Sequence, residues 1–170
     1  SGGGSVYWGN ELIRFAKNLN RPVHTVTLFA ASMGFQTVQG LDKRYILANG
    51  ELMSHKARGG VFGEFPGQLD KRLAHYKRGM ELSDLITVNR SNGKQTLKSY
   101  QNLIENEFWC YSIDCVNKGF ADKVVTATCD SSMDGETMDF IKFIYQERFE
   151  VEIQLFYDKC PLQSALKSYR

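Results

Sequence analysis

The sequence lacks the features that would point to a membrane, nucleic-acid or metal-binding protein. None of its apolar runs approaches the roughly 20 residues that a membrane-spanning helix needs. The 21 basic and 19 acidic residues are interspersed, so no basic stripe favours nucleic acid. Its four cysteines form no Cys-x-x-Cys pair and have no histidine nearby, which argues against a zinc site. We therefore expect no membrane span, no nucleic-acid partner, no metal and no other cofactor.

Repeats, low-complexity tracts and Pro/Gly-rich linkers are also missing, and 170 residues suit one domain with a sizeable core. We expect Cys110 and Cys115 to fill apolar space. Cys129 and Cys160 bracket the tail and could pair with each other in an oxidising compartment.

The most informative stretch is Ala30-Ala31-Ser32-Met33-Gly34. The run before it, residues 23–29, is rich in β-branched and aromatic side chains and predicts a buried strand. Ser32 would then lie at the strand's carboxyl end, where open α/β sheets place their chemistry. A serine on a strand-to-helix turn can serve as a nucleophile beside free backbone N–H groups. The alternative is a serine that only caps the following helix.

The chain begins with Ser1-Gly2-Gly3-Gly4, followed by a helical pattern over residues 8–19. The start of a helix carries unpaired N–H groups, so a glycine turn that leads into it suits an oxyanion or a phosphate. The alternative is a flexible Gly/Ser linker.

Further along, residues 43–48 predict a strand, Asn49-Gly50 a turn, and residues 51–55 a strand that ends at His55. The two other histidines, His24 and His75, are given no role. We expect helices to begin at residue 35 and to cover residues 64–89 and 96–106. In the tail, residues 136–146 could form a helix, and residues 150–157 alternate like a strand.

Taken together, the glycine turn, the Ser32 segment and the run from Lys43-Arg44-Tyr45 to Met53-Ser54-His55 resemble the proteolytic subunit of the Clp proteases. The resemblance extends to Gly119-Phe120-Ala121-Asp122 and covers about three quarters of the chain. It implies an α/β fold of the Clp protease/crotonase type with repeated β-β-α units, in which the family's N-terminal part is missing. It also implies a protease core over residues 1–128 and a C-terminal extension of unknown role over residues 129–170.

The resemblance assigns roles to individual residues. Ser32 is the expected nucleophile, His55 the base and Asn106 the third residue of a triad, while the N–H groups of Gly4 and Met33 form the oxyanion hole. Two extended segments would hold a substrate peptide between them, and their expected contact residues are Gly3, Ser5, Val6, Arg58, Gly59 and Gly60.

Asn106 is the chief departure from the family pattern, because an aspartate is expected there. Glu105 and Glu107 are possible substitutes. In an evolved serine triad, exchanging aspartate for asparagine can cost on the order of ten-thousandfold in turnover.

The implied activity is that of a serine endopeptidase acting on peptides or unfolded proteins. The implied assembly is a homo-oligomeric ring, a heptamer or double ring, with an ATP-dependent unfoldase as partner and a cytoplasmic location. Three alternatives remain open at this point: a non-catalytic structural subunit of such a ring, a crotonase-fold enzyme acting on acyl-coenzyme A, and a serine–lysine peptidase that uses Lys56.

Overall fold

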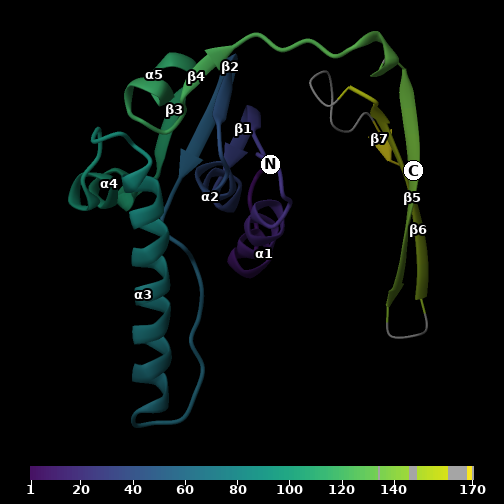
Figure 1. Cartoon of the computed structure of the whole chain (residues 1–170). Helices are drawn as coiled ribbons and strands as arrows, with labels where there is room; N and C mark the ends of the chain where they lie inside the picture. Colours follow the sequence, from purple (N-terminus) through teal and green to yellow (C-terminus); the bar gives the residue numbers. More distant parts are fainter. Residues whose placement is uncertain (134, 146–148, 161–167, 170) are drawn as a thin grey trace. The chain divides into compact units, whose positions relative to one another are not determined.

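The computed structural model describes residues 1–133, 135–145, 149–160 and 168–169 (Figure 1). It divides into two compact units, Ser1–Thr126 and Ala127–Arg170.

The first unit is built on a mixed four-stranded sheet. The strands are β1 (Thr25–Ala31), β2 (Arg44–Ser54), β3 (Phe108–Tyr111) and β4 (Lys123–Val125). β1 and β4 both pair with β2 in parallel, whereas β3 pairs with it antiparallel. The helices are α1 (Val6–Lys17), α2 (Met33–Gly40), α3 (Gln68–Asn89), α4 (Leu97–Leu103), the short 3₁₀ turn η1 (Ile104–Asn106) and α5 (Ser112–Asn117). This arrangement confirms the predicted α/β fold class.

The core lies between one face of the sheet and the helices α2, α4 and α5. Strand alternation decides which side chains enter it: Phe108 and Cys110 of β3 are buried, while Trp109 and Tyr111 between and beside them are exposed. The centre is aromatic, with Phe35 stacked on Tyr100 and packed edge-on against Phe120. These contacts fix α2, and therefore the turn before it, against the sheet.

The predicted turn at Asn49-Gly50 is wrong, because β2 runs unbroken from Arg44 to Ser54. The sequence signal instead marks an irregularity in the pairing with β1, where the register jumps from Thr27 opposite Ile46 to Phe29 opposite Glu51. A Cβ atom on Gly50 would lie 2.5 Å from the Thr27 carbonyl oxygen. A glycine is required here because another backbone approaches closely, not because the chain reverses.

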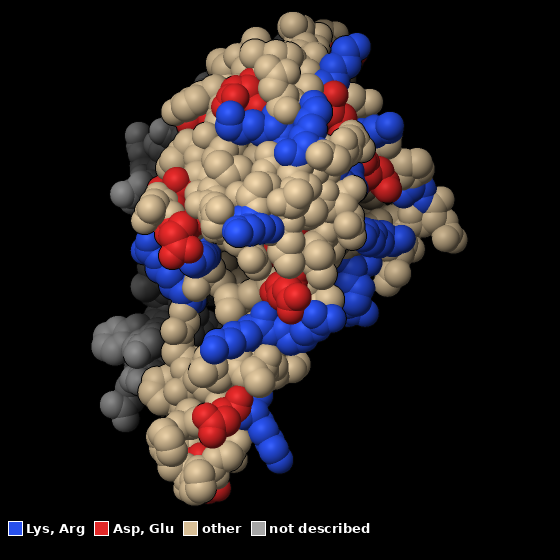
Figure 2. Space-filling view, turned by 90° about the vertical axis from the view of Figure 1, so that its left-hand side faces the viewer, with Lys and Arg blue, Asp and Glu red and all other residues tan. Residues whose placement is uncertain are grey.

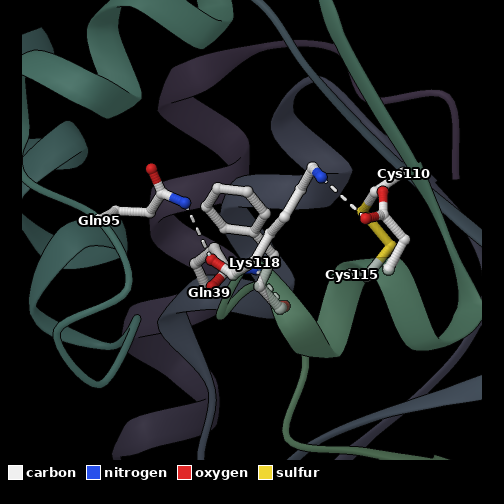
Figure 3. The surroundings of a disulfide bond; sticks show 7 residues. Gln39, Gln95, Cys110, Cys115 and Lys118 are labelled. Atoms are coloured by element: carbon white, nitrogen blue, oxygen red, sulfur yellow. Dashed lines mark hydrogen bonds and ion pairs between the residues drawn. A yellow bond between two sulfur atoms is a disulfide. The ribbon is translucent and has the colours of Figure 1, made fainter.

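Cys110 and Cys115 are buried, as expected, but the prediction that they merely fill apolar space is wrong, since they form a disulfide between β3 and α5 (Figure 3). Their Cα atoms lie 5.2 Å apart, within the range that a disulfide spans. The direct passage from strand to helix brings the two side chains together.

The second unit is a three-stranded antiparallel sheet of β5 (Glu136–Tyr145), β6 (Phe149–Asp158) and β7 (Ser168–Tyr169), preceded by a 3₁₀ turn at Ser131–Met133. The helix predicted over residues 136–146 is wrong, because residues 136–145 form β5 and pair along their full length with β6; Gln146 lies outside the described residues. Their many β-branched and aromatic residues favour a strand. The strand over residues 150–157 is confirmed, and Cys129 and Cys160 pair.

Charges of both signs are scattered over the face shown in Figure 2, among mostly uncharged residues. In the described part of the chain, no helix is both long and apolar enough to cross a membrane.

Candidate functional site

Ser32 occupies the single residue between the end of β1 and the start of α2. Its backbone has φ 55° and ψ −120°, a conformation that residues other than glycine rarely adopt. The turn is nevertheless fixed, because the Ser32 N–H donates to the Met53 carbonyl at 3.0 Å and its own carbonyl accepts from Gln36 N–H at 3.2 Å. A strained serine held between a strand and a helix is the geometry of a nucleophile turn.

The glycine segment at the start of the chain lies directly against this turn. The Ser1 amino group donates to the Phe29 carbonyl at 2.7 Å, and Ala31 N–H donates back to the Ser1 carbonyl at 2.9 Å. A Cβ atom on Gly3, where φ is +91°, would lie 2.7 Å from Ser32 Cβ and 2.8 Å from the Met33 nitrogen. Only a glycine lets the two backbones approach this closely.

Of the predicted substrate-contacting residues, Val6 differs from expectation in its conformation. It is the first residue of α1, and Ser5 caps this helix by accepting a 3.5 Å hydrogen bond from the Trp8 N–H. Gly3, Gly4 and Ser5 are therefore the non-helical residues of this segment. Arg58, Gly59 and Gly60 are exposed in a stretch without helix or strand that runs back along α3 (Figure 1).

His55 directly follows β2, whose residue Met53 is bonded to the Ser32 turn. Its Nδ1 lies 2.6 Å from the carbonyl oxygen of Lys56. Because a carbonyl oxygen can only accept, Nδ1 must carry the hydrogen, and the neutral ring then has its lone pair on Nε2. This is the tautomer that a general base needs when its Nε2 faces the nucleophile.

The segment with Asn106 lies beside the same end of β2, because β3 pairs antiparallel with it and Phe108 lies opposite Ser54. Asn106 itself is exposed at the end of η1. Glu105 forms an ion pair with Lys56, and Glu107 accepts a 2.9 Å hydrogen bond from the Trp109 indole. Among the described residues, no hydrogen bond joins the side chains of Ser32, His55 and Asn106 to one another.

A further carboxyl group is that of Asp84 in α3. It is half-buried, and the positive charge of Lys56 acts on it. Burial raises the pKa of Asp84 above its ordinary value, although a 3.1 Å hydrogen bond from Gln101 opposes the rise. The described residues contain no group of three or more His, Cys, Asp or Glu side chains placed to hold a metal ion.

Sequence reasoning missed a polar cluster formed by the buried residues Ser54 and Tyr100 and the half-buried Gln36. The Tyr100 hydroxyl lies 2.8 Å from Ser54 Oγ and accepts from Gln36 Nε2 at 3.3 Å. The available signal was strand alternation, since Ser54 shares the inward face of β2 with Leu52.

Comparison with known proteins agrees with the resemblance. Residues 1–128 match the family model for Clp protease, which covers three quarters of the chain. Over 129 residues, or 74% of its length, this chain is 27% identical to an ATP-dependent Clp protease proteolytic subunit of Streptococcus suis. Its identity to the corresponding subunits of Streptococcus mutans and Streptococcus equi is also 27%, over 74% and 72% of the chain. It spans 65%, 65% and 64% of these relatives' lengths, just under two thirds. The chain belongs to the Clp protease family.

Proposed function

We propose that this protein is a serine peptidase that cleaves peptide bonds with Ser32 as nucleophile and His55 as general base. The observation that carries the proposal is the Ser32 turn. This strained serine is bonded through its backbone to β2, the strand that His55 directly follows, and the glycine segment is packed against it. Membership of the Clp protease family supports a protease-type activity.

In the proposed reaction, Ser32 Oγ attacks the carbonyl carbon of the substrate while His55 Nε2 takes its proton. The N–H groups of Met33 and Gly4 stabilise the negative oxygen of the tetrahedral intermediate, which is usually the largest single electrostatic contribution. His55 then gives the proton to the leaving amine. Water, activated by the same imidazole, then attacks the acyl carbonyl and breaks the ester bond, which frees Ser32 and releases the second product as a carboxylic acid.

The proposed third residue is Asn106, and a second group already orients the ring. The Lys56 carbonyl accepts from His55 Nδ1 at 2.6 Å, so the imidazole has the required tautomer without any side-chain partner. A carbonyl oxygen carries no full charge, however, and stabilises the imidazolium less than a carboxylate does. We therefore expect a slow enzyme that depends chiefly on Ser32 and His55.

We further propose a peptide or unfolded protein as substrate, held as an added strand by Gly3, Ser5 and Val6 on one side and Arg58, Gly59 and Gly60 on the other. Because Val6 is helical, its contribution would come from its side chain, and the residue is 52% exposed. Assembly into a ring and partnership with an unfoldase follow from the family proposal. The division into a protease core over residues 1–128 and an extension over 129–170 belongs to the same proposal.

The cytoplasmic location stays a prediction, and the two disulfides bear on it. Disulfides are rare in cytosolic proteins and persist in oxidising compartments. Measuring the number of free thiols in protein isolated from its native cells under acid quench would decide between the two environments.

Labelling with a fluorophosphonate, read by intact mass, tests the activity. We expect one adduct on the wild-type protein and none on Ser32→Ala. His55→Gln should label at least a hundredfold more slowly, because the serine then has no base. An unlabelled but folded wild-type protein would overturn the proposal.

Two glycines provide a matched test of the oxyanion hole. Gly3→Ala places a methyl group within 2.8 Å of the Met33 nitrogen and should displace the segment, which costs on the order of a hundredfold in labelling if one oxyanion donor is lost. Gly2→Ala meets no atom within 4 Å and should label like the wild type. Equal rates for both variants would contradict a role for this segment.

A second candidate function is a non-catalytic ring subunit that keeps the fold. It is favoured by the exposed position of Asn106 and by the ion pair that engages Glu105 with Lys56. An assembled, folded oligomer that takes no fluorophosphonate would support this alternative.

A further inference from the structure

We infer that Tyr100 is a positioning residue. Its hydroxyl joins the helix after Ser32 to the strand before His55 and so holds the side chains of Ser32 and His55 in the relative position that the reaction needs. The inference rests on the proposed function, because it gives a mechanical role to a residue behind the same site. Tyr100 comes from α4 and is fully buried.

The contacts of the hydroxyl reach both halves of the site. On one side Ser54 Oγ lies 2.8 Å away, and Ser54 is the residue that directly precedes His55. On the other side Gln36 Nε2 donates to the hydroxyl at 3.3 Å, and the Gln36 N–H donates to the Ser32 carbonyl at 3.2 Å. One hydroxyl group therefore links the backbone at the nucleophile to the backbone at the base.

The long helix α3 completes the cluster. Gln36 Oε1 accepts from Ser83 Oγ at 3.0 Å and from Thr87 Oγ1 at 3.4 Å, while its amide hydrogens face Tyr100. Hydrogen bonds that run in one direction through Gln36 polarise one another, which strengthens such a chain in a buried setting. Within the described residues no buried side-chain nitrogen or oxygen lacks a partner, so the cluster is fully satisfied.

The hydroxyl also stays protonated in any ordinary assay. Burial raises the pKa of Tyr100 to about 12, although the hydrogen bonds with Ser54 and Gln36 oppose the rise. A neutral hydroxyl can accept from Gln36 and donate to Ser54 at the same time. Its ring is held by Phe35 and Phe120, so the oxygen has little freedom to move away.

The variant Tyr100→Phe removes only this oxygen and keeps the aromatic packing. We expect fluorophosphonate labelling to slow by roughly ten- to a hundredfold, because an ångström-scale displacement of a reacting group can cost about a hundredfold. We also expect a shift of the His55 imidazole signals in the proton NMR spectrum. The chain has three histidines, so His55→Gln assigns these signals directly.

Val38→Ala is the matched control for a general loss of stability. Val38 lies in the same core and on the same helix as Gln36, but it is apolar and has no part in the hydroxyl cluster. Even if Val38→Ala lowers the midpoint of unfolding as much as Tyr100→Phe does, it should leave the His55 signals in place. Ser54→Ala gives a milder test, and its effect should not add to that of Tyr100→Phe, because both break the same bond.

Two outcomes would overturn the inference: labelling of Tyr100→Phe at the wild-type rate, or His55 signals that move no more in Tyr100→Phe than in Val38→Ala. A wild-type protein that takes no label would overturn the proposed function instead. The NMR comparison would then still decide whether Tyr100 positions His55.

Discussion

The two ends of β2 are held in opposite ways. At its start, Arg44 is 1% exposed and its side chain donates to Asp122, Gln39 and the carbonyls of Gly119 and Arg90. At its other end, His55 is followed by Lys56, whose ion pair with Glu105 lies largely in solvent. The same strand therefore begins in a buried ionic cluster and ends among exposed charges.

The difference separates the part of the molecule that fixes geometry from the part that can adjust. A buried arginine without its partners is strongly destabilising, so the start of β2 tolerates few changes. Exposed ion pairs contribute little and can rearrange when a substrate arrives. The sites that carry the family resemblance most closely, Ser32 and His55, lie near the adjustable end, but the hydroxyl of Tyr100 supports them from the core.

The largest effect is expected from Asp122→Asn, which breaks the buried end. Asp122 accepts from the Arg44 side chain at 2.6 Å and from the Arg44 N–H at 2.8 Å. Its neutralisation leaves the Arg44 charge without a counter-ion, which typically costs about 3–5 kcal/mol of unfolding free energy. Urea denaturation monitored by tryptophan fluorescence would measure the loss.

Asp114→Asn is the control for this prediction, because Asp114 of α5 pairs at 2.7 Å with Lys118, the residue that follows this helix, and both side chains are partly exposed. Its removal should cost less than about 1 kcal/mol. If the two variants proved equally stable, the contrast between buried and exposed pairs would fail.

The pair of Arg44 and Asp122 at the start of β2 should also make the free energy of unfolding depend on pH. Burial alone would raise the pKa of Asp122, but hydrogen bonds from the Arg44 side chain and backbone outweigh it and hold the pKa below its ordinary 3.8. A depressed carboxyl pKa stabilises the folded state above the unfolded value, and this contribution is lost as pH falls through the folded value. Unfolding free energy should therefore decline below about pH 4 in the wild type. The decline should be shallower in Asp122→Asn, and parallel pH curves for the two proteins would contradict the assignment.

The sequence sufficed where local pattern and backbone chemistry determine the outcome. The strand before Ser32, the helix after it and the position of His55 at a strand end all follow from apolar runs and small residues, and the structure has them. The burial predicted for that strand is wrong in part, because Val26, Leu28 and Phe29 are exposed. The family resemblance then set their order. Helix boundaries were less accurate, as α3 begins at Gln68 rather than at residue 64 because Pro66 and Gly67 precede it.

Local pattern failed where distant segments decide the structure. Asn49-Gly50 has the composition of a turn, yet the close approach of the Thr27 carbonyl makes it part of a strand. Residues 136–145 have apolar spacing that also suits a helix, and pairing with β6 decides for a strand. Tyr100 and Ser54 are 46 residues apart in the sequence, and no periodic pattern indicates their contact, so only the structure reveals it.

At the end of β2 that lies among exposed charges, Asn106→Asp should raise the activity. A carboxylate beside the His55 segment would stabilise the imidazolium that forms during attack, and we expect fluorophosphonate labelling to rise by roughly tenfold. Asn106→Ala should stay within about twofold of the wild type, because the Lys56 carbonyl already sets the tautomer. A large loss in Asn106→Ala would instead mean that the asparagine amide moves inward and orients the ring itself.

The smallest effect is expected from Glu105→Gln, which removes the ion pair with Lys56 and keeps the size of the side chain. The side chains of Lys56 and Glu105 are 52% and 60% exposed, so the change in unfolding free energy should stay below about 1 kcal/mol. Labelling provides the sharper readout, because the freed ammonium lies one residue from His55 and its charge disfavours an imidazolium. We expect labelling to slow by a few-fold at low ionic strength and to recover in high salt, which screens exposed charges. A labelling rate that does not change with salt concentration would mean that Lys56 pairs with another carboxylate. The next residue to substitute would then be Asp84, because the Lys56 charge acts on it.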